Sequence, residues 1–180
     1  MTKKFGIIGN PIKHSLSPVL HNYWFKKYKI DANYSIIETS EKDISNVIKR
    51  VKERDLVGIN ITLPFKQRVV RHIDLLVNDA ELTSSVNTLY QDEKGLIVGE
   101  NTDVFGLQAA YLKEVDNANK KKTLIIGAGG VSPSVILSLQ KSGVRNISIT
   151  NRTLEKCIFL RKKFKNLQII NWEDMKNQIK

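Results

Sequence analysis

The chain has 180 residues, 41% of them hydrophobic, and its 29 basic and 18 acidic side chains give a formal net charge of +11. A chain of this size can bury one hydrophobic core or two small ones. One cysteine excludes an internal disulfide, and the histidines show no zinc spacing, so we expect no metal. No apolar run approaches the roughly 20 residues of a membrane span, and we therefore expect a cytoplasmic protein.

The chain begins with the pattern of a strand followed by a helix. Residues 5–9 form a short apolar run that is closed by a glycine and a proline, which predicts a buried strand and its turn. Ser17 followed by Pro18 predicts the start of a helix that continues to about residue 28, with Ser17 as the N-cap.

A second helix lies between two further predicted strands. Residues 33–39 and 57–62 are β-prone runs that predict these strands. Between them, apolar side chains recur at the spacing of an amphipathic helix, at Ile44, Val47, Ile48 and Val51. The resulting β-α-β-α-β order favours a parallel sheet with right-handed crossovers.

The stretch NITLPFK, residues 60–66, places a lysine just after the third predicted strand. Ligands of open parallel sheets bind outside the carboxyl ends of the strands, which makes Lys66 a candidate functional residue. The alternative is that Phe65 packs on the core and that Lys66 begins the next helix as a solvated residue.

A hairpin and a third helix are predicted next. Residues 85–101 contain two alternating runs around a glycine-containing loop, which is typical of a β-hairpin. Residues 102–115 predict a helix that starts near Thr102 or Asp103.

A domain boundary is predicted where the chain becomes almost wholly polar, at residues 116–122. We therefore expect a first domain at residues 1–117 and a second domain at residues 118–180. The second domain contains the glycine-rich part of the sequence.

Residues 123–143 have the order strand, glycine-rich turn and helix, which is the context of a dinucleotide-binding turn. Gly127 permits the tight turn, and Gly129 lets backbone N–H groups approach a pyrophosphate. The candidate cofactor-binding residues of this turn are Gly127, Ala128, Gly129, Gly130 and Val131. Ser132 occupies the third position of the usual glycine pattern, so the motif is a variant, and a bare tight turn is the alternative.

The strand predicted at residues 146–150 ends in Asn151, Arg152 and Thr153, which are further candidate cofactor-binding residues. An acid at this place usually binds the ribose hydroxyls of NAD, and it is missing here. Because an arginine suits a 2′-phosphate, the sequence favours NADP, unless Arg152 is an ordinary surface residue. A helix to about residue 165, a strand at 167–170 and a short helical end complete the pattern.

The positive charge is a weak indication of nucleic-acid binding. The basic residues fall mainly in two short clusters, at 120–122 and 161–165, which read as solvated surfaces. No nucleic-acid-binding motif accompanies them.

Taken together, the motifs resemble those of the shikimate dehydrogenase family. They are GNPIKHSLSPVLHN (9–22), NITLPFK (60–66), SVNTL (85–89), GENTDVFG (99–106), and GAGGVSPS with NRT (127–134 and 151–153). The resemblance implies an α/β protein with a parallel-sheet substrate domain followed by a Rossmann-like NADP-binding domain. It implies the reversible NADP-linked oxidation of shikimate to 3-dehydroshikimate. We expect a monomer or homodimer that binds neither a membrane nor a specific nucleic acid.

The resemblance also implies roles for individual residues. Ser15 and Ser17 would hold the substrate carboxylate, while Thr62, Asn87 and Asp103 would bind the ring hydroxyls. Lys66 would stabilise the developing alkoxide or transfer the proton, oriented by Asp103. Capping or turn roles are the alternatives for Ser15, Ser17 and Asp103. Such roles are equally open for other residues inside the motifs, which are His14, His21, Asn60 and Asn101.

One departure concerns the second domain, where only three strands are predicted although a full doubly wound dinucleotide domain has about six. We therefore expect that the chain lacks the C-terminal part of the family's sequence and that its NADP-binding domain is incomplete. The alternatives are an inactive shikimate-binding fragment and a quinate/shikimate dehydrogenase that uses NAD.

Overall fold

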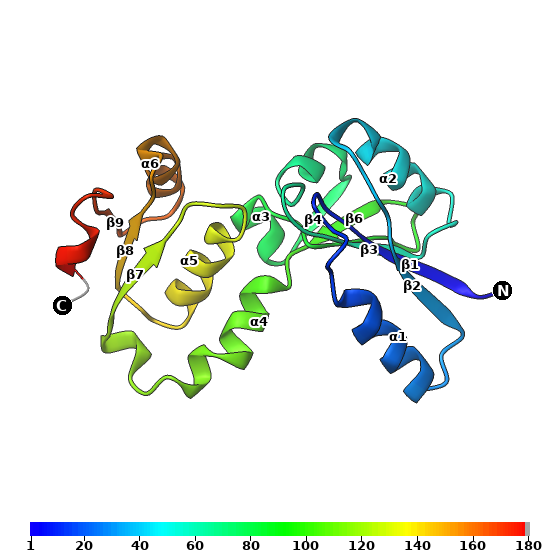
Figure 1. The fold of residues 1–180 in the computed structure, drawn as a ribbon, viewed down its shortest axis with the longest axis horizontal. Coiled ribbons are helices and arrows are strands. Elements are labelled where there is room, and N and C mark those ends of the chain that lie inside the picture. The colour runs from blue at the N-terminus through cyan, green and yellow to red at the C-terminus, as the bar shows by residue number, and fades with distance from the viewer. Residues whose placement is uncertain (179–180) are drawn as a thin grey trace. The chain divides into compact units, whose positions relative to one another are not determined.

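The computed structural model describes residues 1–178 and divides the chain into two compact units, 1–101 and 102–180 (Figure 1). The predicted boundary lay later, after residue 117. The difference arises because helix α4 (Asp103–Ala110) packs on helix α5 (Ser132–Lys141) of the second unit, where the Ser138 hydroxyl donates to the Val104 carbonyl oxygen at 3.1 Å. Among the described residues, no helix has the length and apolar character needed to cross a bilayer.

The first unit is built on one six-stranded sheet, with the strand order β2-β1-β3-β5-β6-β4. The pairings give five strands one direction, and β5 runs antiparallel to both of its neighbours. The strands are β1 (Lys3–Ile8), β2 (Ala32–Ile36), β3 (Gly58–Ile61), β4 (Leu75–Val77), β5 (Thr88–Gln91) and β6 (Ile97–Glu100). The predicted strands and hairpin are confirmed, whereas the short strand β4 was not predicted.

Helices α1 (Ser17–Lys27) and α2 (Ile44–Lys52) lie on opposite faces of this sheet (Figure 1). The four apolar residues predicted to line α2 are buried, and they pack with β1, β3 and β5 into the main core of the unit. By contrast, α1 contributes no buried residue, and its half-buried Phe25 contacts Phe5 with the ring centroids 5.5 Å apart. A short helix, α3 (Asp79–Thr83), and the 3-10 segments Glu41–Asp43 and Arg68–His72 complete the unit.

The predicted N-cap of α1 was wrong by one residue. Leu16 occupies the cap position with helical backbone angles, so Ser17 is already inside the helix. The Ser17 N–H instead donates to the Ser15 hydroxyl oxygen at 3.3 Å. Ser15 therefore satisfies one of the backbone donors that the helix start leaves open.

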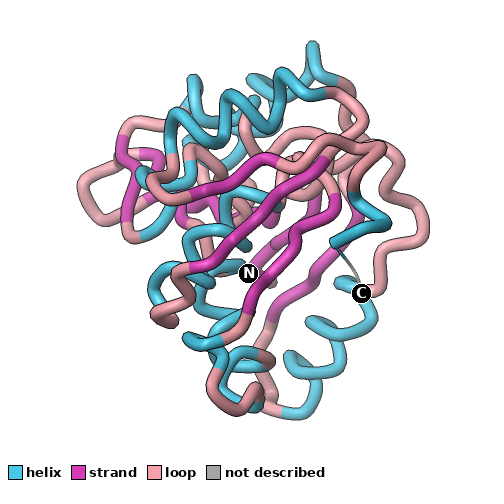
Figure 2. Tube along the Cα trace, turned by 90° about the vertical axis from the view of Figure 1, so that its left-hand side faces the viewer, coloured by secondary structure: helices cyan, strands magenta, loops and turns pink. Residues whose placement is uncertain are grey.

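The second unit contains a three-stranded parallel sheet in the order β7-β8-β9, whose strands are magenta in Figure 2. These strands are β7 (Lys122–Ile126), β8 (Asn146–Thr150) and β9 (Leu167–Ile169), as predicted. Helices α4, α5 and α6 (Leu154–Lys163) bury their apolar side chains with the sheet in one core. The remaining helical turns are Leu112–Glu114, Ala118–Lys120 and Met175–Gln178, and residues 179–180 of the predicted helical end lie outside the described part.

Candidate functional site

The motifs of the first unit meet at one edge of its sheet. Strands β1, β3 and β6 end at this edge, and the antiparallel β5 begins there. The sheet topology therefore gathers the segments that follow Ile8, Ile61 and Glu100 and the segment that precedes Thr88. These segments are far apart in the sequence and carry most of the candidate substrate-binding residues.

Backbone hydrogen bonds tie two of these segments together. The Thr62 N–H donates to the Ile8 carbonyl oxygen and the Asn10 N–H donates to the Leu63 carbonyl oxygen, both at 2.9 Å. A Cβ atom at Gly9 would lie 2.5 Å from Thr62 Cγ2, so only glycine permits this close approach. The contact fixes the start of the loop that carries Ser15 and leads to α1 beside Thr62.

The segment before β5 is held by equally regular bonds. The Ile61 N–H donates to the Asn87 carbonyl oxygen at 2.9 Å, and the Asn87 N–H donates to the Glu100 carbonyl oxygen at 3.0 Å. The Val86 N–H donates to the Lys66 carbonyl oxygen at 2.9 Å. Asn87 thus lies between β3 and β6, and the Lys66 backbone is attached to the same segment.

Lys66 is buried, with 9% of its surface exposed, on the turn that follows β3. The next helical segment begins only at Arg68, and Phe65 beside the lysine is 1% exposed. The interpretation of Lys66 as the solvated start of a helix is therefore wrong, although Phe65 does pack on the core as expected. Lysines are rarely buried unless they interact with a partner, which marks this position as unusual.

A chain of side-chain hydrogen bonds runs below the same edge. The Tyr34 hydroxyl donates to Asn60 Oδ1 at 2.7 Å, and Asn60 Nδ2 donates to the Asn87 carbonyl oxygen at 3.1 Å and to Thr88 Oγ1 at 3.2 Å. Thr88 Oγ1 lies 3.1 Å from Asn87 Oδ1, to which it donates. Tyr34 and Thr88 were not predicted as site residues, because no local signal distinguishes these hydroxyls from those of other strand residues.

Three other motif residues have local roles or positions. Asn101 is buried and donates to Thr83 Oγ1 at 3.1 Å and to the Ser85 carbonyl oxygen at 2.9 Å, so it braces the segment before β5. The His21 ring stacks on Tyr34 with centroids 4.2 Å apart, and burial lowers the pKa of His21. His14 is exposed in the loop before α1.

The glycine-rich turn of the second unit lies between β7 and α5. Gly127 has a φ of +111°, which favours glycine, and its N–H donates to the Thr150 carbonyl oxygen at 2.8 Å. A Cβ atom at Gly127 or Gly129 would meet no atom within 4 Å, so the space above the turn is open to a ligand. Ser132, at the variant third position of the glycine pattern, is buried, and its hydroxyl donates to the Gly127 carbonyl oxygen at 3.0 Å.

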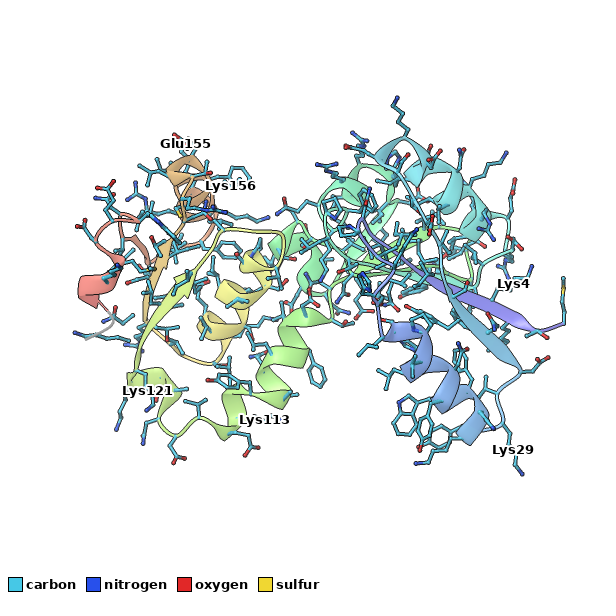
Figure 3. The ribbon with its side chains drawn as sticks, viewed as in Figure 1. Lys4, Lys29, Lys113, Lys121, Glu155 and Lys156 are labelled. Carbon is cyan, nitrogen blue, oxygen red and sulfur yellow. The ribbon has the colours of Figure 1, made fainter. Side chains whose placement is uncertain are left out.

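The segment after β8 is joined to this turn through Asn151. Its Oδ1 accepts from the Ala128 N–H at 3.1 Å, and its Nδ2 donates to the Thr153 carbonyl oxygen at 2.9 Å. Arg152 and Thr153 are exposed. Lys156, which was not predicted as a site residue, adds a basic side chain on the first turn of α6 (Figure 3). The residues therefore fit a phosphate-bearing dinucleotide, with open space at the turn and cations beside it.

Asp103 is the first residue of α4, where its negative charge interacts favourably with the positive end of the helix dipole. It belongs to the second unit, whereas Lys66 belongs to the first. Their functional pairing stays a prediction, as do the roles of the other candidate residues.

These features define a two-unit α/β protein with a polar sheet-edge site in one unit and a dinucleotide-type turn in the other. Residues 7–89 match the family model of the shikimate dehydrogenase substrate binding domain, and residues 109–180 match that of shikimate / quinate 5-dehydrogenase. The chain belongs to the shikimate dehydrogenase family.

Individual relatives agree with this assignment. The chain is 45% identical to the NADP(+) shikimate dehydrogenase of Pelagibacter ubique over 96% of its own length and 64% of the relative's. Its fold matches the shikimate dehydrogenase of Aquifex aeolicus with a TM-score of 0.89 at 33% identity, covering 98% of this chain and 66% of that one. It also matches a Thermus thermophilus enzyme solved with NADP(H) and shikimate, with a TM-score of 0.84 at 30% identity and coverages of 96% and 64%. The chain thus spans slightly less than two thirds of each of these proteins.

Proposed function

We propose that the protein acts in the reversible NADP-linked oxidation of shikimate to 3-dehydroshikimate. The observation that carries the proposal is the meeting of the family's motif segments at one sheet edge, where backbone hydrogen bonds join residues 8–10, 61–66, 86–87 and 100. The Thermus thermophilus relative, which binds both shikimate and NADP(H), supports the same substrate and cofactor.

The substrate would bind at this edge through neutral donors. Ser15 and Ser17, both half-buried at the start of α1, would donate to the carboxylate. Thr62 and Asn87, half-buried on either side of the β3 end, would bind ring hydroxyls. Hydrogen bonds from such groups give orientation as well as affinity, because each lost partner leaves a polar group unsatisfied.

Lys66 would provide the polar catalytic group. NADP, when bound, supplies the acceptor for the hydride that leaves the substrate carbon. The protonated lysine would stabilise negative charge on the substrate oxygen, while its neutral amine form would accept the hydroxyl proton during oxidation and return it as the ammonium during reduction. Burial of the lysine on a turn anchored by Phe65 supports this role, since a fixed charge needs little reorganisation during the reaction. Asp103 would orient the lysine and the adjacent hydroxyl.

The cofactor would bind over the turn at Gly127–Val131 and beside Asn151–Thr153. The backbone N–H groups at the start of α5 would face the pyrophosphate. Arg152 would bind the 2′-phosphate, and Lys156 adds positive charge nearby. Because no carboxylate stands at the end of β8, NADP is preferred to NAD.

The decisive experiment follows NADPH formation by the 180-residue chain with shikimate and NADP. Parallel reactions contain quinate or NAD, and thermal unfolding with and without shikimate shows whether the sample is folded and binds. Turnover that is fastest with shikimate and NADP would support the full proposal. Stabilisation by shikimate without turnover would reduce the chain to a binding fragment, and the absence of both would refute the proposal.

A further inference from the structure

Tyr34 on β2 is a polar residue inside an otherwise apolar cluster. It is 4% exposed and packs with Ile7 and Ile12 on the face of the sheet that α1 covers. A buried hydroxyl costs free energy unless it is hydrogen-bonded, and a phenylalanine would fill the same space without that cost. The hydroxyl therefore requires an explanation beyond packing.

The Tyr34 hydroxyl is bonded to β3, the strand that leads into the candidate residues Thr62 and Lys66. It donates to Asn60 Oδ1 at 2.7 Å on β3. Burial raises the pKa of Tyr34, an effect that the Ser17 side chain partly opposes. The Tyr34 hydroxyl therefore stays protonated and donates its proton to Asn60.

The chain of bonds continues from Asn60 to Asn87. Asn60 Nδ2 donates to Thr88 Oγ1, and Thr88 Oγ1 donates to Asn87 Oδ1 at 3.1 Å. Because the side-chain oxygen of Asn87 accepts this hydrogen bond, the orientation of the Asn87 side-chain amide is defined. A continuous relay thus connects Tyr34 on β2 with Asn87 before β5, two residues that are far apart in the sequence.

Tyr34 itself is held from several sides. Asn22 Nδ2 donates to the Tyr34 carbonyl oxygen at 2.8 Å, and the Tyr34 N–H donates to Asn22 Oδ1 at 2.9 Å. The His21 ring stacks on the tyrosine ring at an interplanar angle of 7°. The ring cannot turn without breaking these contacts, so the hydroxyl has a fixed position between α1 and β3.

We propose that Tyr34 is a positioning residue that acts through Asn60 and Thr88 to fix the orientation of the Asn87 amide, which would bind a ring hydroxyl of the substrate. This inference rests on the proposed function. Tyr34 itself does not contact the substrate, and its effect reaches the substrate through Asn87 at the far end of the relay. Buried polar networks of this kind favour one arrangement when each member is satisfied.

The test compares Tyr34→Phe with two other variants of the 180-residue chain by calorimetric titration with shikimate. Tyr34→Phe keeps the ring and its stacking and removes only the hydroxyl, and we expect about tenfold weaker binding. Thr88→Val breaks the relay at its other end and is also expected to weaken binding, which keeps the test valid if Tyr34→Phe fails to fold. The control is Tyr90→Phe on β5, a half-buried tyrosine of the same sheet outside the relay, which should bind as the wild type does.

A thermodynamic cycle separates positioning from a general loss of stability. If Tyr34 acts through Asn87, the double variant Tyr34→Phe/Asn87→Ala binds more tightly than the product of the two single losses predicts. In two-dimensional NMR spectra, Tyr34→Phe should also shift the side-chain amide signals of Asn60 and Asn87, whereas Tyr90→Phe should not. If wild type binds shikimate and Tyr34→Phe and Thr88→Val bind it equally well, the relay alone is overturned. Strictly additive losses of affinity in the double variant would have the same consequence. A wild-type chain that does not bind shikimate would overturn the proposed function, and the relay with it.

Discussion

The side-chain oxygen of Asn151 accepts a hydrogen bond from the Ala128 N–H at 3.1 Å. This bond joins the end of β8 to the glycine-rich turn after β7, two segments that follow neighbouring parallel strands. Within its own segment, Asn151 Nδ2 donates to the Thr153 carbonyl oxygen at 2.9 Å. One side chain therefore couples the shape of the turn to the position of the residues that would select the cofactor.

Replacing Asn151 by alanine should weaken NADP binding about tenfold, because the Ala128 N–H loses its acceptor and the turn is no longer fixed. Fluorescence titration with NADPH measures the change. Asn171→Ala, which removes an exposed asparagine after β9, is the matched control and should leave affinity unchanged. Equal affinities of Asn151→Ala and the wild type would contradict the coupling.

Arg152→Ala should reduce affinity for NADP at least about tenfold and change affinity for NAD little, because only NADP carries the 2′-phosphate. Titrations with the two cofactors under identical salt conditions provide the measurement. Arg161→Ala, on α6, removes the same charge from an exposed position in the basic cluster and controls for long-range attraction. An equal loss of affinity for NADP and NAD would contradict the assignment of Arg152 to the 2′-phosphate.

Lys66→Met should lower turnover about 100-fold or more, while shikimate affinity stays within a few-fold of the wild-type value. Methionine keeps an unbranched apolar stem in the buried position and removes only the charge. The rate of NADPH formation and the dissociation constant for shikimate are measured on the same sample. Lys42→Met, at an exposed position in the 3-10 segment before α2, serves as the control. Retained turnover in Lys66→Met would remove the lysine from the mechanism.

Phe65→Ala should lower the free energy of unfolding by about 3–5 kcal/mol, since the side chain is 1% exposed and its loss leaves a cavity in the main core. Urea denaturation measures this change. Phe159→Ala, 64% exposed on α6, should alter stability by no more than about 0.5 kcal/mol. A small effect at Phe65 would mean that the turn bearing Lys66 is not anchored by the core.

The histidines predict a loss of stability in acid. Burial lowers the pKa of His21, and burial together with the nearby Arg71 charge lowers that of His72. The unfolded chain therefore binds protons more readily near the usual histidine pKa of about 6.5, and the free energy of unfolding should fall as the pH drops through that range. Urea midpoints measured from about pH 7.5 to about pH 5 should fall less in His21→Phe, which keeps a ring beside Tyr34. An identical pH dependence in the variant would exclude a contribution from His21.

Local patterns predicted the elements whose cause is local. The spacing of Ile44, Val47, Ile48 and Val51 placed α2 correctly, because an amphipathic period depends only on neighbouring residues. The order of strand, glycine turn and helix around Gly127 was equally readable, because the backbone angle at that glycine is a local requirement. Strand β4 has three residues, too few for a period to be recognised.

Long-range contacts explain what the sequence left open. Position after β3 suggested a role for Lys66, but its burial depends on contacts with Val86 and the core, which no local pattern encodes. The role of the Tyr34 hydroxyl could not be predicted from the sequence, because its partner Asn60 lies on another strand, β3. The unit boundary after Asn101 depends on the packing of α4 against α5, whereas polarity alone favoured a later position.

The antiparallel direction of β5 also separates two edges of the first sheet. Its amino end contributes Asn87 to the edge that bears Lys66, while its carboxyl end enters the hairpin loop at 92–96, where Asp92 Oδ1 accepts from the Lys94 and Leu96 N–H groups. The loop therefore turns at the far ends of the strands, away from the residues that the family motifs mark. Insertions and sequence drift can accumulate in this loop without displacing the opposite edge, so variation in loop length among homologues carries little information about catalysis.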